Sequence, residues 1–487
     1  MSVVAVCLAS EATLGQWTVD FVVDQQNAEA ALGAARVGPM TGALARVKTR
    51  LERILTGSTG AVVFTLTWAS PVSPTAIGEA QISLFYGASA AVARDRLINQ
   101  AEADNEPAAE VALYNALPAP NIPFFWSGNT GANATSVVIP SALNKHLGFA
   151  PQTTSNDGTI TMRPPSATLK WQFWNAQLKP GHQLFEAVVF HECCHLLGFV
   201  SRSDATVQPT ALCSWDLFRF AESNVPASTG QFLLLPRELR PTVEASWITR
   251  VGDPGAIYKA SRGARTGGDG FDGSHWRSES RLTPRVPVGV MDPSSSTSIT
   301  FTALQSRYYT RADVEALDIM GWNVQPTPSL FAVADTVSLV SPPASAVAAT
   351  GAPLTFEWSN SGAEYWTLYI YQGSDASDDE PFRVYDNLTA LTVSVPPEEA
   401  LPAGQYVWYV VASTNAGIVE SEHRALTVQL ACPADFNGDG NVDPDDLADF
   451  IACYFSLPAC PEGDFNHDGI VDPDDLADYV AAHFEGC

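Results

Sequence analysis

The stretch HECCHLLGFVS, residues 191–201, decides how most of this 487-residue chain is interpreted. The apolar residues 184–190 before it contain no helix breaker, so we expect a buried helix on which His191 and His195, four residues apart, share one face. Two imidazoles placed in this way can bind one zinc ion, and Glu192 can accept the proton of an attacking water as a general base. Gly198 predicts the end of the helix and a sharp turn.

The third zinc ligand is not given by this stretch. A catalytic zinc ion usually has three protein ligands and a water. Many metzincin peptidases continue as H-E-x-x-H-x-x-G-x-x-H, but Ser201 stands where the last histidine would be. The residues leave three candidates open, namely Asp204 directly after the turn, Glu222 and His275.

The order of motifs resembles the leishmanolysin family of metzincins, in which a long insertion separates the glycine from the third histidine. Residues 273–276 (GSHW) are similar to the segment around that histidine, 288–293 (VGVMDP) to the Met-turn and 310–322 to the closing helix. The resemblance covers about residues 150–322. It implies a zinc peptidase with His191, His195 and His275 as ligands and Glu192 as catalytic base. It also implies structural roles for Gly198 and Met291, and a peptide substrate extended along a sheet edge, for which we expect the strand 159–162.

Composition and length limit the functions and the domain organisation that the rest of the chain can have. The formal net charge of −27 disfavours nucleic-acid binding, and no apolar run is long enough for a membrane span. We expect a multidomain protein, divided as follows: 1–12, a candidate signal-peptide remnant; 13–327, a mixed α/β zinc peptidase domain; 328–333, a linker; 334–430, an all-β sandwich of immunoglobulin or fibronectin type III type; and 431–487, a small α-helical calcium-binding domain. Within the first domain we expect a strand at 17–24, a helix over 28–55 interrupted at Gly38-Pro39, and a single strand over 80–86.

A repeat near the C-terminus matches the spacing of a calcium loop. The ligand positions are Asp435, Asn437, Asp439, Asn441, Asp443 and Asp446 in the first copy, and Asp464, Asn466, Asp468, Ile470, Asp472 and Asp475 in the second. Asn441 and Ile470 offer backbone carbonyls, and aspartate replaces the glutamate that usually ends an EF-hand loop. A helix after each loop makes the pair resemble dockerin type I, which implies two Ca²⁺ ions and a cohesin-like or cell-surface partner. Pro444-Asp445 and Pro473-Asp474 depart from the hydroxyl pair that this recognition ordinarily uses.

Eight cysteines, four of them in the last 56 residues, indicate disulfides and a secreted or cell-surface protein. We expect the pairs Cys453–Cys460 and Cys432–Cys487, and Cys194 with Cys213 as a fastening between the insertion and the active helix. The leading interpretation is a secreted zinc endopeptidase. Two alternatives stay open: a catalytically silent zinc-binding protein, and a zinc hydrolase of non-peptide substrates.

Overall fold

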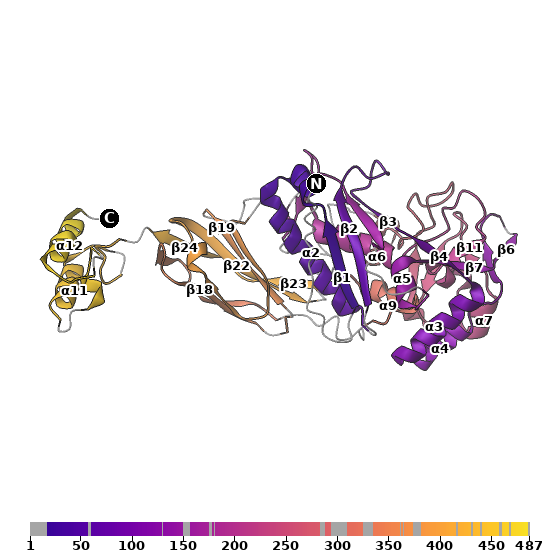
Figure 1. Cartoon of the computed structure of the whole chain (residues 1–487). Helices are drawn as coiled ribbons and strands as arrows, with labels where there is room; N and C mark the ends of the chain where they lie inside the picture. The colour runs from indigo at the N-terminus through magenta and orange to yellow at the C-terminus, as the bar shows by residue number, and fades with distance from the viewer. Residues whose placement is uncertain are drawn as a thin grey trace. The chain divides into compact units, whose positions relative to one another are not determined.

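The chain is mixed α/β and forms two compact units (Figure 1). Residues up to Val333 make up most of the first unit, and Ala334–Ser413 with Val419–Cys487 make up the second. The computed structural model describes residues 17–56, 60–128, 130–149, 156–174, 178–179, 181–282, 288–293, 309–324, 335–360, 362–363, 365–373, 381–414, 417–429, 432–438, 441–456, 460–466 and 469–485. The expected signal-peptide remnant and linker lie outside these residues. No helix in the described ranges is long and apolar enough to cross a membrane.

The first unit contains a four-stranded sheet. Its order is β1 (Trp17–Val23), β2 (Gly60–Trp68), β8 (Gly158–Met162) and β3 (Gly78–Ile82). The first three strands run parallel, and β3 pairs antiparallel with β8 at the edge. The helix α2 (Ala34–Ile54) packs on β1, and α6 (Phe185–Leu197) packs on β3 and β8. The edge that we expected at residues 159–162 was wrong, because β8 has a strand on each side and the edge strand is β3.

Two boundaries differ from the expected ones. The helical region breaks at Gly33, between α1 (Gln25–Leu32) and α2, and α2 continues through Pro39. Gly33 has φ +85°, a backbone conformation that other residues rarely adopt, so it decides the break. The expected strand 80–86 is two strands: Ser83 still donates its N–H to the carbonyl of Asp157 beside β8 at 3.1 Å, whereas the carbonyl of Leu84 already accepts the N–H of Ser141 at 3.0 Å. The second of them, β4 (Phe85–Ser89), pairs with β7 (Ser136–Pro140) in another sheet.

The rest of the first unit is built from short elements. The strands are β5 (Ile122–Phe125), β6 (Gly131–Ala134), β9 (Lys170–Gln172), β10 (His182–Leu184), β11 (Ala211–Cys213), β12 (Arg219–Ala221), β13 (Arg237–Glu238), β14 (Ala245–Ile248) and β15 (Ile257–Ala260), and the helices are α3 (Ala90–Asp104), α4 (Ala108–Asn115), α5 (Ser141–His146), α7 (Thr229–Leu234) and α9 (Arg311–Ile319). The expected insertion, residues 199–274, contains β11 to β15 and packs on a buried aromatic cluster. In that cluster the ring of Trp215 lies 4.6 Å from Trp247 and 4.9 Å from Trp276, measured between ring centroids.

A buried ion network joins α2 to α6. The carboxylate of Glu186 accepts from Arg46 Nε at 2.5 Å and from Arg50 Nη1 at 2.6 Å, and all three side chains are at most 2% exposed. Two guanidinium groups one helical turn apart therefore hold the first turn of α6 against α2.

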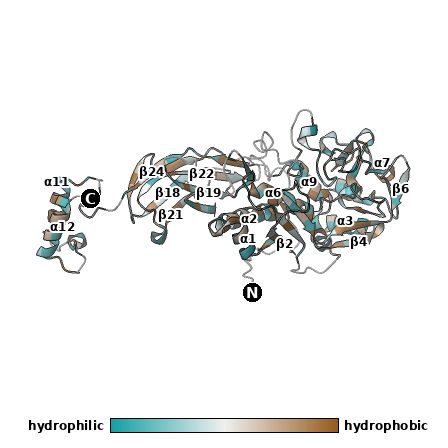
Figure 2. Cartoon of the chain, turned by 90° about the horizontal axis from the view of Figure 1, so that it is seen from above, coloured by the Kyte–Doolittle hydropathy of each residue, from teal (hydrophilic) through white to brown (hydrophobic). Residues whose placement is uncertain are grey.

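The second unit contains a two-sheet β-sandwich. One sheet has the order β16 (Ser338–Ser341), β18 (Leu354–Ser359), β21 (Thr392–Val395); the other has β17 (Ala346–Ala349), β24 (Arg424–Gln429), β22 (Gly404–Thr414), β19 (Tyr365–Gln372), β20 (Arg383–Leu388), with β23 (Gly417–Glu420) paired to β22. Side chains of both sheets share one core that includes Phe356, Trp358, Leu368 and Trp408. Burial alternates along β18 and β21, which is the pattern of half-buried strands, whereas β19 and β22 are buried along most of their length; Figure 2 shows hydrophobic and hydrophilic residues on these strands.

The C-terminal segment has two helices, α11 (Pro444–Tyr454) and α12 (Pro473–Glu485), one after each copy of the repeat. Phe450 and Tyr479 occupy equivalent positions in the two copies, and their rings stack at 3.9 Å with 6° between the planes. The repeat therefore supplies its own hydrophobic core.

One of the expected cysteine pairs is confirmed and one is wrong. Cys453 and Cys460 form a disulfide. Cys432 is also in a disulfide, and its expected partner Cys487 lies outside the described residues. Cys194 and Cys213 are free, buried thiols, as is Cys193. Hydrogen bonds fasten the insertion instead: the Ser201 hydroxyl donates to Asp216 at 2.6 Å, and the Ser201 N–H donates to the hydroxyl of Ser274 at 2.9 Å.

Candidate metal centre

The helix α6 presents His191 and His195 on one face and ends at Gly198. Gly198 has φ +143°, and its N–H reaches the carbonyls of Cys194 and His195 at 3.1 and 3.2 Å. A Cβ at this position would lie 3.3 Å from the sulfur of Met320, so the glycine also permits close packing against the end of α9. The turn expected at Gly198 is therefore present, and it leads the chain into the insertion.

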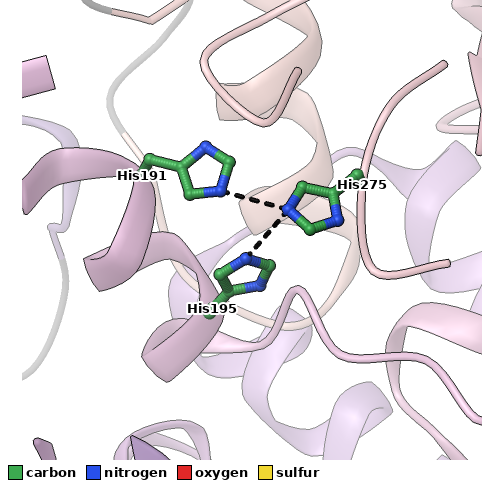
Figure 3. A group of neighbouring side chains, drawn as sticks. All are labelled: His191, His195 and His275. Atoms are coloured by element: carbon green, nitrogen blue, oxygen red, sulfur yellow. Dashed lines mark hydrogen bonds between the residues drawn. The ribbon is translucent and has the colours of Figure 1, made fainter. Parts of the chain in front are cut away.

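The structure brings His275 to the two helical histidines. The Nε2 atom of His275 lies 3.1 Å from that of His191 and 3.2 Å from that of His195, and the three rings point toward one another (Figure 3). These ligand atoms lie within 4.8 Å of one another. The two rival candidates are engaged elsewhere, because Asp204 accepts backbone N–H groups and Glu222 forms an ion pair with Lys259.

Hydrogen bonds fix the tautomer of each ring. The Nδ1 atoms lie 2.7 Å from the carbonyl of Val290 for His191, 2.7 Å from that of Phe199 for His195 and 3.0 Å from that of Asp272 for His275. A carbonyl can only accept, so each Nδ1 carries the proton and each Nε2 presents a lone pair.

Three lone pairs that face one another at this distance repel unless a cation lies among them. Three nitrogens bound to one tetrahedral zinc ion at about 2.0–2.1 Å would be about 3.3 Å apart, close to the separations found here. Burial lowers the pKa of all three histidines to about 3, so the rings are neutral at ordinary pH. The donor set therefore fits zinc.

The turn around Met291 supports two of the ligands through its backbone. The Val290 carbonyl accepts from His191, and the Met291 carbonyl accepts the N–H of Trp276, the residue after His275, at 3.0 Å. The Met291 side chain is fully buried.

Sequence reasoning missed the side chain that holds this turn. The Asp313 carboxylate, on α9, accepts the Val290 N–H at 2.8 Å and the Trp276 indole N–H at 2.7 Å. A Cβ at Gly289 would lie 2.3 Å from this carboxylate, so the approach requires glycine. The signal available in the sequence was the Thr310–Asp313 capping box, which predicts a helix start but not these contacts.

Glu192 lies between the histidines and the edge strand β3. Its side chain is 6% exposed, and a Cβ at Gly78 on β3 would lie 2.9 Å from its Oε1. Burial raises the pKa of Glu192 to about 8; the neighbouring Glu79 adds to the rise and the Ala80 N–H opposes it. Burial alone thus favours the protonated acid, and a cation held by the three histidines would lower this pKa and favour the carboxylate that a general base requires.

A cleft of about 790 Å³ opens over these groups. Its lining includes residues of β3, the side chains of His191, Glu192 and His195 on α6, and Phe271 and Asp272.

The calcium loops are described in part. In the first loop, Asp446 accepts the N–H groups of Asn437 at 3.0 Å and Asp443 at 2.9 Å. In the second, the equivalent Asp475 accepts those of Asn466 at 3.1 Å and Asp472 at 2.8 Å. Gly469 turns the second loop with φ +92°. Asp439 and Asp468 lie outside the described residues; the other expected ligand residues, Asp435, Asn441, Asp464 and Ile470 among them, lie in these loops.

Another group of carboxylates, Glu106, Glu110 and Asp318, also meets within ligand distance. Burial and the neighbouring carboxylates raise the pKa of Glu106 to about 7, and burial raises those of Glu110 and Asp318. Partial protonation reduces the repulsion among these three carboxyl groups, so their proximity requires no metal ion, and we assign none to them.

Comparisons with known proteins give local structural similarity alone. No family model matches it, and no curated protein matches it. Solved structures with local similarity include an engineered protein (21% identity, 20% of each chain, TM-score 0.15), the fibronectin(III)-like modules of Clostridium thermocellum CbhA (19% identity, 20% of this chain and 47% of that one, TM-score 0.16) and the sulfur carrier protein SoxY of Chlorobium limicola f thiosulfatophilum (15% identity, 20% and 80%, TM-score 0.14). These likenesses cover a fifth of the chain and identify neither a family nor a function.

Proposed function

We propose that the first unit is a zinc-dependent endopeptidase of metzincin type, similar to the leishmanolysin family. The observation that carries the proposal is the convergence of three Nε2 lone pairs, each fixed by an Nδ1 hydrogen bond to a carbonyl, beside a buried glutamate. His191, His195 and His275 are the proposed ligands.

The chemistry of the site follows from its donors. A zinc ion held there would polarise a carbonyl group and acidify a water molecule. Glu192 takes the proton from the attacking water and delivers it to the leaving amine. The low exposure of Glu192 limits competing water around its carboxylate.

The edge strand β3 supports an extended substrate. It pairs on one side with β8, lines the cleft and lies directly against Glu192. A peptide that adds to this edge by backbone hydrogen bonds would bring one of its carbonyls to the histidine centre.

Hydrolysis of casein by the purified chain, with and without a chelator, tests the proposal. Glu192→Ala should lower kcat by about 10²–10⁴-fold, the usual contribution of a general base, while zinc content stays stoichiometric because Glu192 is not a ligand. Zinc binding without cleavage of any protein or peptide would favour the silent zinc-binding protein. Cleavage of only non-peptide esters or amides would favour the other alternative.

For the second unit we propose an immunoglobulin or fibronectin type III-like sandwich and a dockerin-like module that binds two Ca²⁺ ions and a cohesin-like or cell-surface partner. The equivalent hydrogen bonds of Asp446 and Asp475 support two matched calcium loops. The disulfide Cys453–Cys460 supports secretion to an oxidising compartment.

A further inference from the structure

The third histidine lies on a segment that has little intrinsic order. Residues 261–275 form no helix or extended strand and include five glycines, three of which (Gly263, Gly267 and Gly270) have φ between +90° and +99°. Fixing such a segment costs backbone conformational entropy at every residue, so specific contacts must hold it in place.

Asp204 supplies contacts at both ends of this segment. Its Oδ1 accepts the Ala264 N–H at 2.5 Å and the Arg265 N–H at 3.3 Å, and its Oδ2 accepts the Gly273 N–H at 2.6 Å. A Cβ at Gly273 would lie 1.7 Å from the Ser203 hydroxyl. The chain after α6 therefore lies directly against the chain before His275.

One peptide group connects Asp204 to the ring of His275. The carbonyl of Asp272 accepts from His275 Nδ1 at 3.0 Å, and the N–H of the same peptide, that of Gly273, donates to Asp204. A negative acceptor at the N–H end polarises the amide and makes its carbonyl a stronger acceptor. The peptide that serves His195 is different, because the Val200 N–H donates to the neutral carbonyl of Gly198 at 2.7 Å.

We propose that Asp204 is a positioning residue for His275 that acts through the 272–273 peptide group. It fixes the place of the ring and strengthens the hydrogen bond at Nδ1, which makes Nε2 a better donor to a metal. The inference rests on the proposed zinc site, but the Asp204–peptide–His275 chain itself is independent of a metal.

The test compares Asp204→Asn with Asp269→Asn. The control residue Asp269 is a buried carboxylate of the same segment that accepts from Ser261 Oγ at 2.9 Å, the Arg262 N–H at 3.0 Å and Arg277 Nη1 at 2.9 Å, whereas the Gly273 N–H donates to Asp204. The zinc dissociation constant should rise about 10–100-fold in Asp204→Asn, as for other residues that orient a ligand, and stay near the wild-type value in Asp269→Asn. Equal weakening in both variants, or none in Asp204→Asn, would overturn the proposal.

A nuclear magnetic resonance measurement on the metal-free protein separates this inference from the zinc assignment. The Nδ1–H resonance of His275 should move upfield in Asp204→Asn, whereas that of His195 should not move. An unchanged His275 resonance would overturn the proposal even in a protein that binds zinc, and failure of the wild type to bind zinc would overturn the proposed function alone. Should the variant not fold, hydrogen exchange at the Gly273 amide of the wild-type protein decides: slow exchange is expected, and exchange at the rate of an open loop contradicts the proposal.

Discussion

Backbone carbonyls at Val290, Phe199 and Asp272 decide what the three histidines can bind. Because these groups accept only, they hold the protons on Nδ1 and leave Nε2 for a cation. No nearby side chain has to change its protonation state for this selection. The site is therefore set by backbone geometry, which makes it sensitive to the loop that carries His275.

The contribution of His275 to zinc binding can be compared with that of Glu222, the candidate ligand that the structure places in an ion pair instead. His275→Ala should remove stoichiometric zinc, because two ligands on one helix do not complete a catalytic site. Glu222→Ala should keep its zinc, because that carboxylate is occupied with Lys259. Metal analysis after dialysis checks both variants. Loss of zinc in Glu222→Ala and retention in His275→Ala would show that the ligand set is wrong.

At the scale of elements, α6 depends on the Glu186 network beneath it. Glu186→Gln would remove the buried carboxylate charge that accepts from Arg46 and Arg50, and breaking such a buried ion pair costs about 3–5 kcal/mol. Urea unfolding should show that the free energy of unfolding of the first unit falls by this amount. The matched control is Asp95→Asn, because the Arg94–Asp95 pair is exposed and contributes about 0–1 kcal/mol. Equal losses of stability in the two variants would show that burial does not determine how much the Glu186 ion pairs contribute to stability.

The elements that sequence reasoning located are those whose signal is local. Four-residue spacing places His191 and His195, and Gly198 ends their helix, because both features depend on a single turn of backbone. His275 was reached only through a family resemblance, since nothing local ties it to a helix 80 residues earlier. The edge strand was misassigned, because the neighbours of β8 are set by pairing across the chain.

The function of Asp204 could not be predicted for a related reason. Its value depends on which way the 272–273 peptide faces, and peptide orientation leaves no trace in the residue types. Asp204 was a candidate zinc ligand because it is a carboxylate that follows closely after the turn at Gly198. The sequence sign that this backbone must be held by other groups was the high glycine content of residues 261–275.

On the scale of the whole molecule, the two proposed metals serve different units. The zinc donors are neutral imidazole nitrogens, and those of the calcium loops are carboxylate and carbonyl oxygens, so the sites select different ions. The loops lie in residues 432–487, which contain no lysine or arginine, so bound cations would relieve the repulsion among their acids.

The two metals should therefore be removable one at a time. A zinc-selective chelator should abolish peptidase activity and leave the C-terminal segment resistant to proteolysis, whereas a calcium-selective chelator should expose that segment and leave zinc content unchanged. Asp446→Ala, which also removes the hydrogen bonds to Asn437 and Asp443, should lower the calcium stoichiometry from two to one, and Asp475→Ala should do the same through the second loop. Calorimetric titration counts the ions, and limited proteolysis reports the fold of the segment. Two ions still bound in both variants would contradict the ligand positions, because each loop would then bind its ion without the carboxylate that closes it.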